Sequence, residues 1–152
     1  PCVAAGPGRP YFVSKPVRPL SGGLIFYQVK AGDTMLHTVS LNENHRFRAL
    51  YARGRHSAGG RLAVYAMKNR LKDASRMGIT VSSKLGGAVT RNRVRRRLRE
   101  CYRMLEHETR PGWDIVIVAR HGALRSDFAG LTREMRAHLK KLDIARGSGP
   151  DD

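Results

Sequence analysis

Acidic side chains are scarce in this 152-residue chain, which has 12 aspartates and glutamates against 29 lysines and arginines. The formal net charge of +17 at pH 7 works against compact folding through self-repulsion, so we expect a polyanion in the working state. Arginine carries most of the excess, and its planar guanidinium pairs with forked anions better than an ammonium group does. Nucleic acid is therefore the expected partner, and an anionic membrane surface is the alternative.

Cysteine and long apolar runs are also rare. Cys2 and Cys101 lie far apart and show no CxxC spacing, so neither a disulfide framework nor a zinc site is expected. We interpret Cys101 as a small core residue. No apolar run approaches the ~18 residues of a membrane-spanning helix, and we find no lipidation signal and no cleavable leader at the start. The sequence thus predicts a cytoplasmic protein without a membrane partner.

Clustered catalytic groups are missing as well. The carboxylates are dispersed, without the DxD pair or carboxylate–histidine cluster that a two-metal nuclease needs. Glu106, His107 and Glu108 are adjacent, but on a helix they point in different directions and are predicted to form a solvated helix end. The histidines lack metal-ligand spacing, and no serine lies in a nucleophile-elbow pattern. We expect no catalytic residue and no metal site on this protein.

Three regions differ in composition. Proline and glycine are concentrated near the start, and we predict that residues 1–34 are a disordered N-terminal extension. Residues 35–145 carry regular hydrophobic patterns and are predicted to form one domain. Residues 146–152, which end in RGSGPDD, are predicted to be a disordered tail.

The middle region alternates between helical and strand patterns. SLNENHRFRALYARG predicts a helix with a capping box at Ser40 and Glu43 and an end at Gly54. RLAVYAMK and RMGITVSSK alternate as strands, and NRLKDAS between them suits a hairpin-like loop. WDIVIVAR is apolar almost throughout, as in a strand covered on both faces. SDFAGLTREMRAHLKKL has helical spacing, with Ser126 as its N-cap. This order predicts an α+β domain with helices packed on a sheet.

The stretch VTRNRVRRRLRE, residues 89–100, contains six arginines in nine residues and no acid before Glu100. If this stretch and the residues after it form a helix, Val94, Leu98, Cys101 and Leu105 line up as one narrow apolar stripe. The arginines cover most of the remaining circumference. Like charges four residues apart cost about 0.2–0.5 kcal/mol per pair, and the helix dipole disfavours cations in the first turns.

A solvated helix face usually mixes charges of both signs, so we interpret the arginine face as a phosphate-binding surface. Gly86 and Gly87 precede the helix and allow the backbone to approach an anion closely. Lys84 lies beside them.

The stretch GITVSSKLGGAVTRNRVRRRLRECYR resembles the strand–loop–helix signature of the bacterial ribonuclease P protein component. The resemblance extends from about Leu41 to Leu142 and includes LNENHRFRALYARG upstream and WDIVIVAR downstream. Two positions depart from the family pattern. Ser83 stands where a lysine is usual, and Gly87 replaces a polar or basic residue.

The resemblance implies an α-β sandwich of the ribosomal protein S5 domain 2-like kind. Such a fold has a mixed central sheet, three helices and a left-handed βαβ crossover, here made by the arginine helix. The resemblance also implies the protein subunit of the endoribonuclease ribonuclease P, in which the RNA subunit removes the 5′ leader of precursor tRNA. The implied partners are ribonuclease P RNA and precursor tRNA, with no protein partner required. Mg²⁺ would be bound mainly by the RNA subunit.

The resemblance assigns two sets of residues. Those expected to bind the catalytic RNA are Lys84, Arg91, Asn92, Arg93, Arg95, Arg96 and Arg99. Those expected to line a cleft for the single-stranded leader are Phe47, Tyr51, Ala63, Tyr65 and Thr80. Aromatic rings beneath a single strand offer stacking of about 1–3 kcal/mol per base. Simple core packing is the alternative for the three aromatic residues.

Two other functions remain open from the sequence. One is a structural RNA-binding protein of the ribosomal type, with the same basic helix and no leader cleft. The other is a DNA-binding protein that places the arginine helix in a major groove. Charge around the whole exposed helix suits irregular phosphate surfaces better than a base-reading edge, which favours RNA.

Overall fold

The computed structural model describes residues 12–17, 25–30 and 35–146. Strands β1 (Phe12–Val17) and β2 (Ile25–Lys30) pair antiparallel and form a two-stranded sheet of their own. The rest of the predicted N-terminal extension, and residues 147–152 of the predicted tail, lie outside the described residues. Their disorder stays a prediction.

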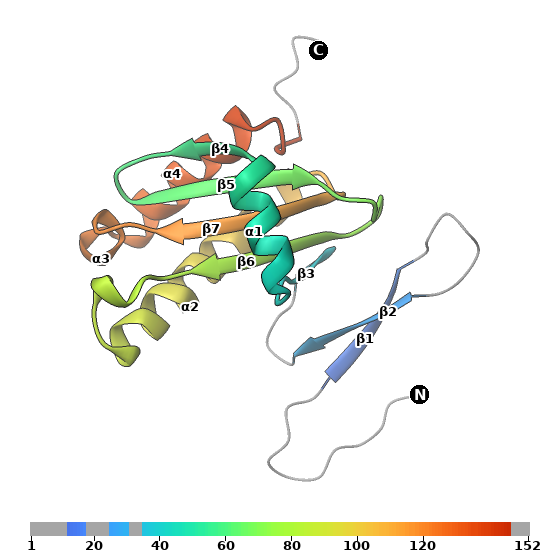
Figure 1. Cartoon of the computed structure of the whole chain (residues 1–152), viewed down its shortest axis with the longest axis horizontal. Helices are drawn as coiled ribbons and strands as arrows, with labels where there is room; N and C mark the ends of the chain where they lie inside the picture. The colour runs from blue at the N-terminus through green and yellow to red at the C-terminus, as the bar shows by residue number, and fades with distance from the viewer. Residues whose placement is uncertain (1–11, 18–24, 31–34, 147–152) are drawn as a thin grey trace.

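The main domain is built on a mixed five-stranded sheet in the order β3-β6-β7-β5-β4 (Figure 1). Its strands are β3 (Thr38–Ser40), β4 (Arg55–Ala58), β5 (Leu62–Lys68), β6 (Ser75–Thr80) and β7 (Trp113–Ala119). β3, β6 and β7 run parallel to one another, whereas β5 is antiparallel to both β7 and β4. The central strand β7 is the apolar run of the sequence, and all but one of its residues are buried. The prediction of a strand covered on both faces is confirmed.

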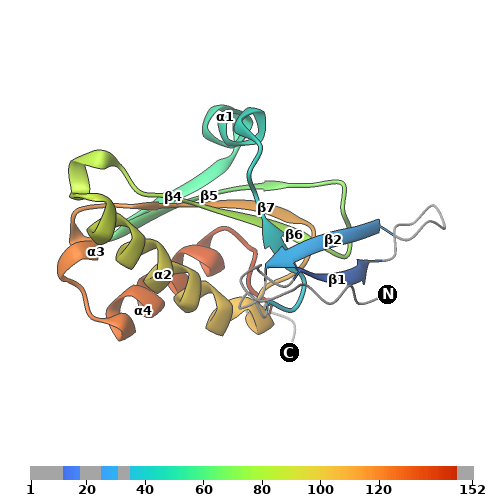
Figure 2. The same ribbon diagram turned by 90° about the horizontal axis from the view of Figure 1, so that it is seen from below.

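Helices cover both faces of this sheet (Figure 2). α1 (Asn44–Arg53) lies on one face, and α2 (Ala88–Leu105) and α4 (Phe128–Lys141) lie on the other. The short segments between them are η1 (Ser83–Leu85), η2 (Glu106–Glu108) and α3 (Gly122–Arg125). The predicted α-β sandwich with three principal helices is confirmed.

The arginine-rich helix α2 connects the parallel neighbours β6 and β7. Seen from the side of α2 with both strands pointing up, β7 lies to the left of β6 (Figures 1 and 2). The crossover is therefore left-handed, as expected from the resemblance and against the strong general preference for right-handed connections. It places the first turns of α2 close to the carboxyl end of β6.

The two faces of the sheet hold separate apolar clusters. Leu62, Val64 and Ala66 of β5 belong to the larger core beneath α2 and α4, as their alternation predicts. The predicted stripe of α2 is buried in the same core, which also takes in the completely buried Tyr102. Cys101 is fully buried there, and burial raises the pKa of its thiol, so it acts as an inert core residue.

The predicted hairpin between β5 and β6 is wrong. These strands are not neighbours, because β7 lies between them. The connecting loop instead closes over the start of β7, where the Asn69 side chain donates hydrogen bonds to the Ala74 carbonyl and to Asp114. A strand that is apolar at nearly every position is best buried at the centre of a sheet, and this packing outweighs the local hairpin signal.

Two predicted helix caps are also wrong. Ser40 belongs to β3, and the N-cap of α1 is Glu43, whose side chain pairs with Arg46 instead of capping the helix. The N-cap of α4 is Asp127, whose carboxylate accepts a hydrogen bond of 3.1 Å from the Gly130 N–H. Each true cap lies close to the predicted one in sequence, and a tertiary contact decided between them.

The predicted solvated helix end is wrong for Glu106, which is completely buried. Its carboxylate accepts hydrogen bonds from the backbone N–H groups of Leu36 (2.6 Å) and His37 (2.9 Å). These bonds tie the segment leading into β3 to the end of α2. A buried carboxylate is tolerated because its oxygens are hydrogen-bonded.

Candidate nucleic-acid interface

The five residues predicted to form the leader cleft lie where α1 covers the sheet: Phe47 and Tyr51 on the helix, and Ala63, Tyr65 and Thr80 on the strand face beneath it. The strand register places Tyr65 of β5 beside Val116 of β7, and Val116 beside Gly78 of β6. Phe47 of α1 packs directly over Gly78, where an added Cβ would lie only 2.5 Å from the ring. Phe47 is thus held inside the α1 cluster, where it packs with Leu41, Leu50 and Val116.

The two tyrosine rings predicted for the cleft contact each other. The ring of Tyr51 lies edge-on to that of Tyr65, with centroids 5.0 Å apart and an interplanar angle of 82°. The Tyr51 hydroxyl is 3.0 Å from the hydroxyl of Thr80, which links α1 to the end of β6. Tyr51 is 43% exposed. The helix therefore presents one tyrosine to solvent beside the carboxyl end of β6.

Next to these rings lies a row of small side chains that crosses four strands. Ala58 of β4 pairs with Ala63 of β5, Ala63 pairs with Val118 of β7, and Val118 pairs with Thr80 of β6. All four side chains are on the α1 face, because each lies two residues from a member of the Tyr65 row. We call Ala58, Ala63, Val118 and Thr80 the small-residue shelf. It extends about 14 Å across the sheet, from three strand spacings of ~4.8 Å.

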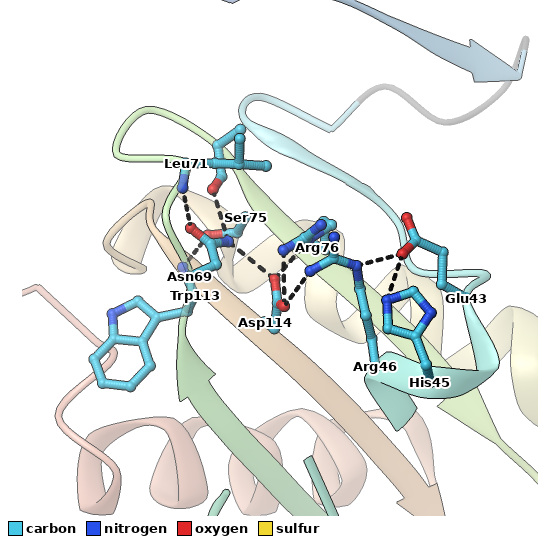
Figure 3. A network of polar contacts seen from close by, with 10 residues as sticks. Glu43, His45, Arg46, Asn69, Leu71, Ser75, Arg76, Trp113 and Asp114 are labelled. Atoms are coloured by element: carbon cyan, nitrogen blue, oxygen red, sulfur yellow. Dashed lines mark hydrogen bonds and ion pairs between the residues drawn. The ribbon is translucent and has the colours of Figure 1, made fainter. Parts of the chain in front are cut away.

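A polar network anchors the other side of α1 (Figure 3). The buried carboxylate of Asp114 accepts two hydrogen bonds from the Arg76 guanidinium, at 2.7 and 2.9 Å, and one of 3.0 Å from Asn69. Arg46 of α1 approaches the same carboxylate at 3.9 Å and also binds Glu43. The hydrogen bond from Arg46 lowers the pKa of the Glu43 carboxyl. The network fixes the first turn of α1 to β6 and β7, and through it the position of the aromatic residues.

Some arginines of α2 have hydrogen-bond partners within the protein, and others have none among the described residues. Arg95 donates a hydrogen bond of 3.1 Å to the Asn92 side chain, and Arg97 binds the Ser126 carbonyl. Arg93 and Arg96 are exposed and have no hydrogen-bond or ion-pair partner among the described residues. They line a shallow groove of about 370 Å³ together with Val89, Asn92 and Arg97.

Unpaired charge is concentrated in the first half of α2. The Nε of Arg91 is buried without a hydrogen-bond partner in the described part of the chain. In the second half, Arg103 pairs with Glu100, and this hydrogen bond lowers the pKa of the Glu100 carboxyl. Lys84 lies exposed in η1, just before the helix. The predicted RNA-binding residues thus begin at Lys84, near the carboxyl end of β6, and continue along α2 to Arg99 in its second half.

One arrangement resembles a hydrolytic triad but is structural. The Ser57 hydroxyl lies 2.7 Å from His138 Nδ1, and His138 Nε2 lies 3.6 Å from the Glu134 carboxylate. Ser57 and His138 are 3% and 7% exposed, respectively, between β4 and α4. A substrate does not reach a hydroxyl in that position. The contacts fasten α4 to the edge of the sheet.

Within the part of the chain that the structure describes, no three histidine, cysteine or carboxylate side chains are grouped so that they could hold a metal ion. In the same residues, no helix has the length and apolar character needed to cross a membrane.

A model of the family described as Ribonuclease P matches residues 35–143, well over half of the chain. The chain belongs to the ribonuclease P protein family. The ribonuclease P protein component of Clostridioides difficile is 38% identical to it over 109 residues, which cover 71% of this chain and 95% of that protein. The component from Lachnoclostridium phytofermentans is 38% identical over 113 residues, covering 74% of this chain and 96% of that protein.

Solved ribonuclease P proteins share the fold. The Staphylococcus aureus RNase P protein superimposes with a TM-score of 0.64 at 29% identity, over 70% of this chain and 97% of that one. The Thermotoga maritima protein gives a TM-score of 0.61 at 27% identity, over 72% of this chain and 99% of that one. The resemblance inferred from the sequence is confirmed. The chain is accordingly a protein component of a ribonucleoprotein endoribonuclease and has an RNA partner.

Sequence reasoning missed several residues that shape this ribonuclease P protein. The network at Asp114 has no local sequence signal, because its members come from three separate elements. His56 was also missed, because the four-residue strand β4 is too short to show a pattern. The ring of His56 stacks on Tyr65, with centroids 5.6 Å apart and an interplanar angle of 24°.

Proposed function

We propose that this chain holds two RNA segments on opposite faces of its sheet. The α2 face binds the RNA subunit of ribonuclease P, and the α1 face takes the 5′ leader of precursor tRNA. The chain thereby assists endonucleolytic removal of the leader in the cytoplasm. The observation that carries the proposal is the small-residue shelf beside the exposed Tyr51 ring and the partly buried Tyr65 ring, on the face of the sheet opposite the arginine helix.

The charge distribution on α2 supports a phosphate partner. The guanidinium groups of Arg93 and Arg96 form no ion pair with the described residues, so their charge is available to a polyanion. Asn92 orients Arg95, which explains an uncharged amide within the arginine run.

The geometry of the α1 face supports a single strand as its ligand. Ring faces and edges of tyrosines attract unstacked bases, and every base offers a π-face regardless of sequence. The side chains of the small-residue shelf are short, so a backbone that reaches this face can approach the sheet more closely there than over the tyrosine rings. A double helix keeps its bases stacked internally and gains nothing from such rings.

Hydrolysis is assigned to the RNA subunit with its Mg²⁺. The described residues of this chain do not form a metal site, so no step of the proposal passes through a metal on the protein. The chain contributes positive charge and positioning, which lower the cost of bringing two polyanions together.

The test is reconstitution with the cognate ribonuclease P RNA at low Mg²⁺ concentration. We expect the chain to restore leader cleavage, and Tyr65→Ala to weaken binding of precursor tRNA about fivefold or more. The same variant should leave the affinities for mature tRNA and for the RNA subunit unchanged. Phe128→Ala removes an exposed ring from the opposite face of the sheet and serves as the control.

Each alternative function predicts a different result. If the chain is a ribosomal-type RNA-binding protein, it should bind structured RNA, and Tyr65→Ala should bind precursor tRNA as tightly as the unmodified chain. A DNA-binding protein would lose its RNA to competing duplex DNA at physiological salt.

A further inference from the structure

His56 belongs to the edge strand β4, and its ring lies on the α1 face of the sheet. The register pairs His56 with Tyr65, and the next residue, Ser57, points to the opposite face, where it is buried against α4. Alternation along a strand therefore fixes His56 on the α1 side. His56 is exposed there.

Three rings form a continuous series from the helix to the edge of the sheet. Tyr51 of α1 meets Tyr65 edge-on, and Tyr65 is stacked by His56. One face of the His56 ring is covered by Tyr65. Neither ring nitrogen of His56 has a hydrogen-bond or ion-pair partner among the described residues, so the residue keeps donor and acceptor capacity as well as an open π-face.

The small-residue shelf runs beside this series and reaches the same edge. Its last member, Ala58, follows His56 by two residues on β4 and lies on the same face. Thr80 ends β6, next to the segment that leads into α2, where the proposed function places the RNA subunit. An RNA strand that continues from there along the shelf reaches β4 beside His56. Arg55, the neighbour of His56 on β4, is engaged by Asp143 and does not replace the imidazole as a ligand group.

We propose that His56 is a leader-binding residue of this ribonuclease P protein, and that it stacks on an unpaired base farther from the cleavage site than the bases over Tyr51 and Tyr65. The ligand is single-stranded RNA, and the contact lengthens the bound segment of the leader. This inference rests on the proposed function of the α1 face and extends it to the edge of the sheet.

The experiment measures the affinity of the reconstituted holoenzyme for precursor tRNAs with leaders of increasing length. We expect His56→Ala to weaken binding about fivefold or more, the loss expected for one base–aromatic stack, and only above a threshold leader length. The threshold should be longer than the length at which the Tyr65→Ala defect first appears. His56→Phe keeps an aromatic face and should stay within about twofold of the unmodified protein.

The control is His107→Ala, which removes an exposed histidine outside the α1 face. His56→Ala could bind precursor tRNA as tightly as the unmodified protein at every leader length, while Tyr65→Ala binds more weakly. That result would overturn the role of His56 and leave the proposed function intact. A defect that also appears with mature tRNA would overturn it too, because it would reflect distortion of the sheet. If neither His56→Ala nor Tyr65→Ala changes the affinity for precursor tRNA at any leader length, both the role of His56 and the proposed function fail.

Discussion

Removing the charge of Asp114 should weaken the whole domain, because this carboxylate is the buried centre of the network that holds α1 on the sheet. Asp114 is 1% exposed and accepts three hydrogen bonds, two of them from Arg76. Arg76 is itself mostly buried, with a side chain 12% exposed. Asp114→Asn leaves this guanidinium without its countercharge in a site that water barely reaches.

Loss of one partner from a buried ion pair costs about 3–5 kcal/mol, mainly because the remaining charge stays desolvated. Asparagine keeps one acceptor oxygen, so we expect a loss near the lower end, about 3 kcal/mol in the free energy of unfolding. With an m value of about 1.5–2 kcal/mol/M, the urea midpoint should fall by about 1.5–2 M. That is a large share of the ~5–15 kcal/mol that stabilises a typical domain.

The matched control is Glu108→Gln, which breaks a two-bond pair with Arg136 on the surface. An exposed pair contributes about 0–1 kcal/mol, so this variant should unfold close to the unmodified protein. A double-mutant cycle with Arg76→Gln should recover part of the loss, since removing both partners leaves no buried charge. If urea unfolding gives Asp114→Asn and Glu108→Gln the same midpoint, the network does not have the role assigned to it.

Three further perturbations test other parts of the structure. Gly78→Ala introduces a Cβ 2.5 Å from the Phe47 ring, so we expect the free energy of unfolding in urea to fall by about 1–3 kcal/mol. The variant should also bind the leader more weakly, with unchanged affinity for the RNA subunit. The control Gly60→Ala, which has no atom within 4 Å of the added Cβ, should change neither stability nor leader binding. Arg93→Gln with Arg96→Gln should reduce the log–log salt slope of RNA-subunit binding by about 0.7–0.9 per lost phosphate contact, measured by titration at several salt concentrations. The same two charges removed from the end of α4, by Lys140→Gln with Lys141→Gln, should leave that slope unchanged, and an equal reduction would contradict the assignment of α2. Burial alone would raise the pKa of the Glu134 carboxyl, but hydrogen bonds from Arg61 and the Leu62 N–H lower it below its ordinary value of 4.5. The stabilisation is then present above pH 4.5 and lost as the pH falls through the lowered pKa, so Glu134→Gln should be less stable than the unmodified protein at pH 7, and the difference should shrink as the pH is lowered below 4.5. A difference that is independent of pH would show that the charge of Glu134 is not responsible.

Much of the architecture could be predicted because it is encoded locally. The apolar stripe of α2, with arginine elsewhere on its surface, follows from helical spacing alone, and so does the burial of Cys101. The alternation of β5 correctly assigned Leu62 and Tyr65 to opposite faces of the sheet. The apolar residues at all but one position of β7 correctly placed that strand in the interior. In each case the period of the side chains decides which face is buried.

The site itself depended on contacts between distant segments. The hydrophobic period of a strand indicates which face each residue occupies, but not which strand lies beside it. The sequence alone therefore suggested a β5–β6 hairpin, whereas β7 lies between these two strands. That insertion aligns Ala63, Val118 and Thr80 into one row and brings Arg76 to Asp114. It is decided by the burial of β7, a property of the whole packed domain.

The sequence by itself determined that this protein carries a strongly basic helix on an α+β domain, because charge and hydrophobic period are properties of short segments. Only the tertiary structure decided that His56 stacks on Tyr65, that Glu106 is buried, and that Ser57 and His138 are packed away from any substrate. The physical reason is that hydrogen-bond partners, burial and ring contacts arise between residues far apart in the chain. They come into existence only when the strands take their order in the sheet.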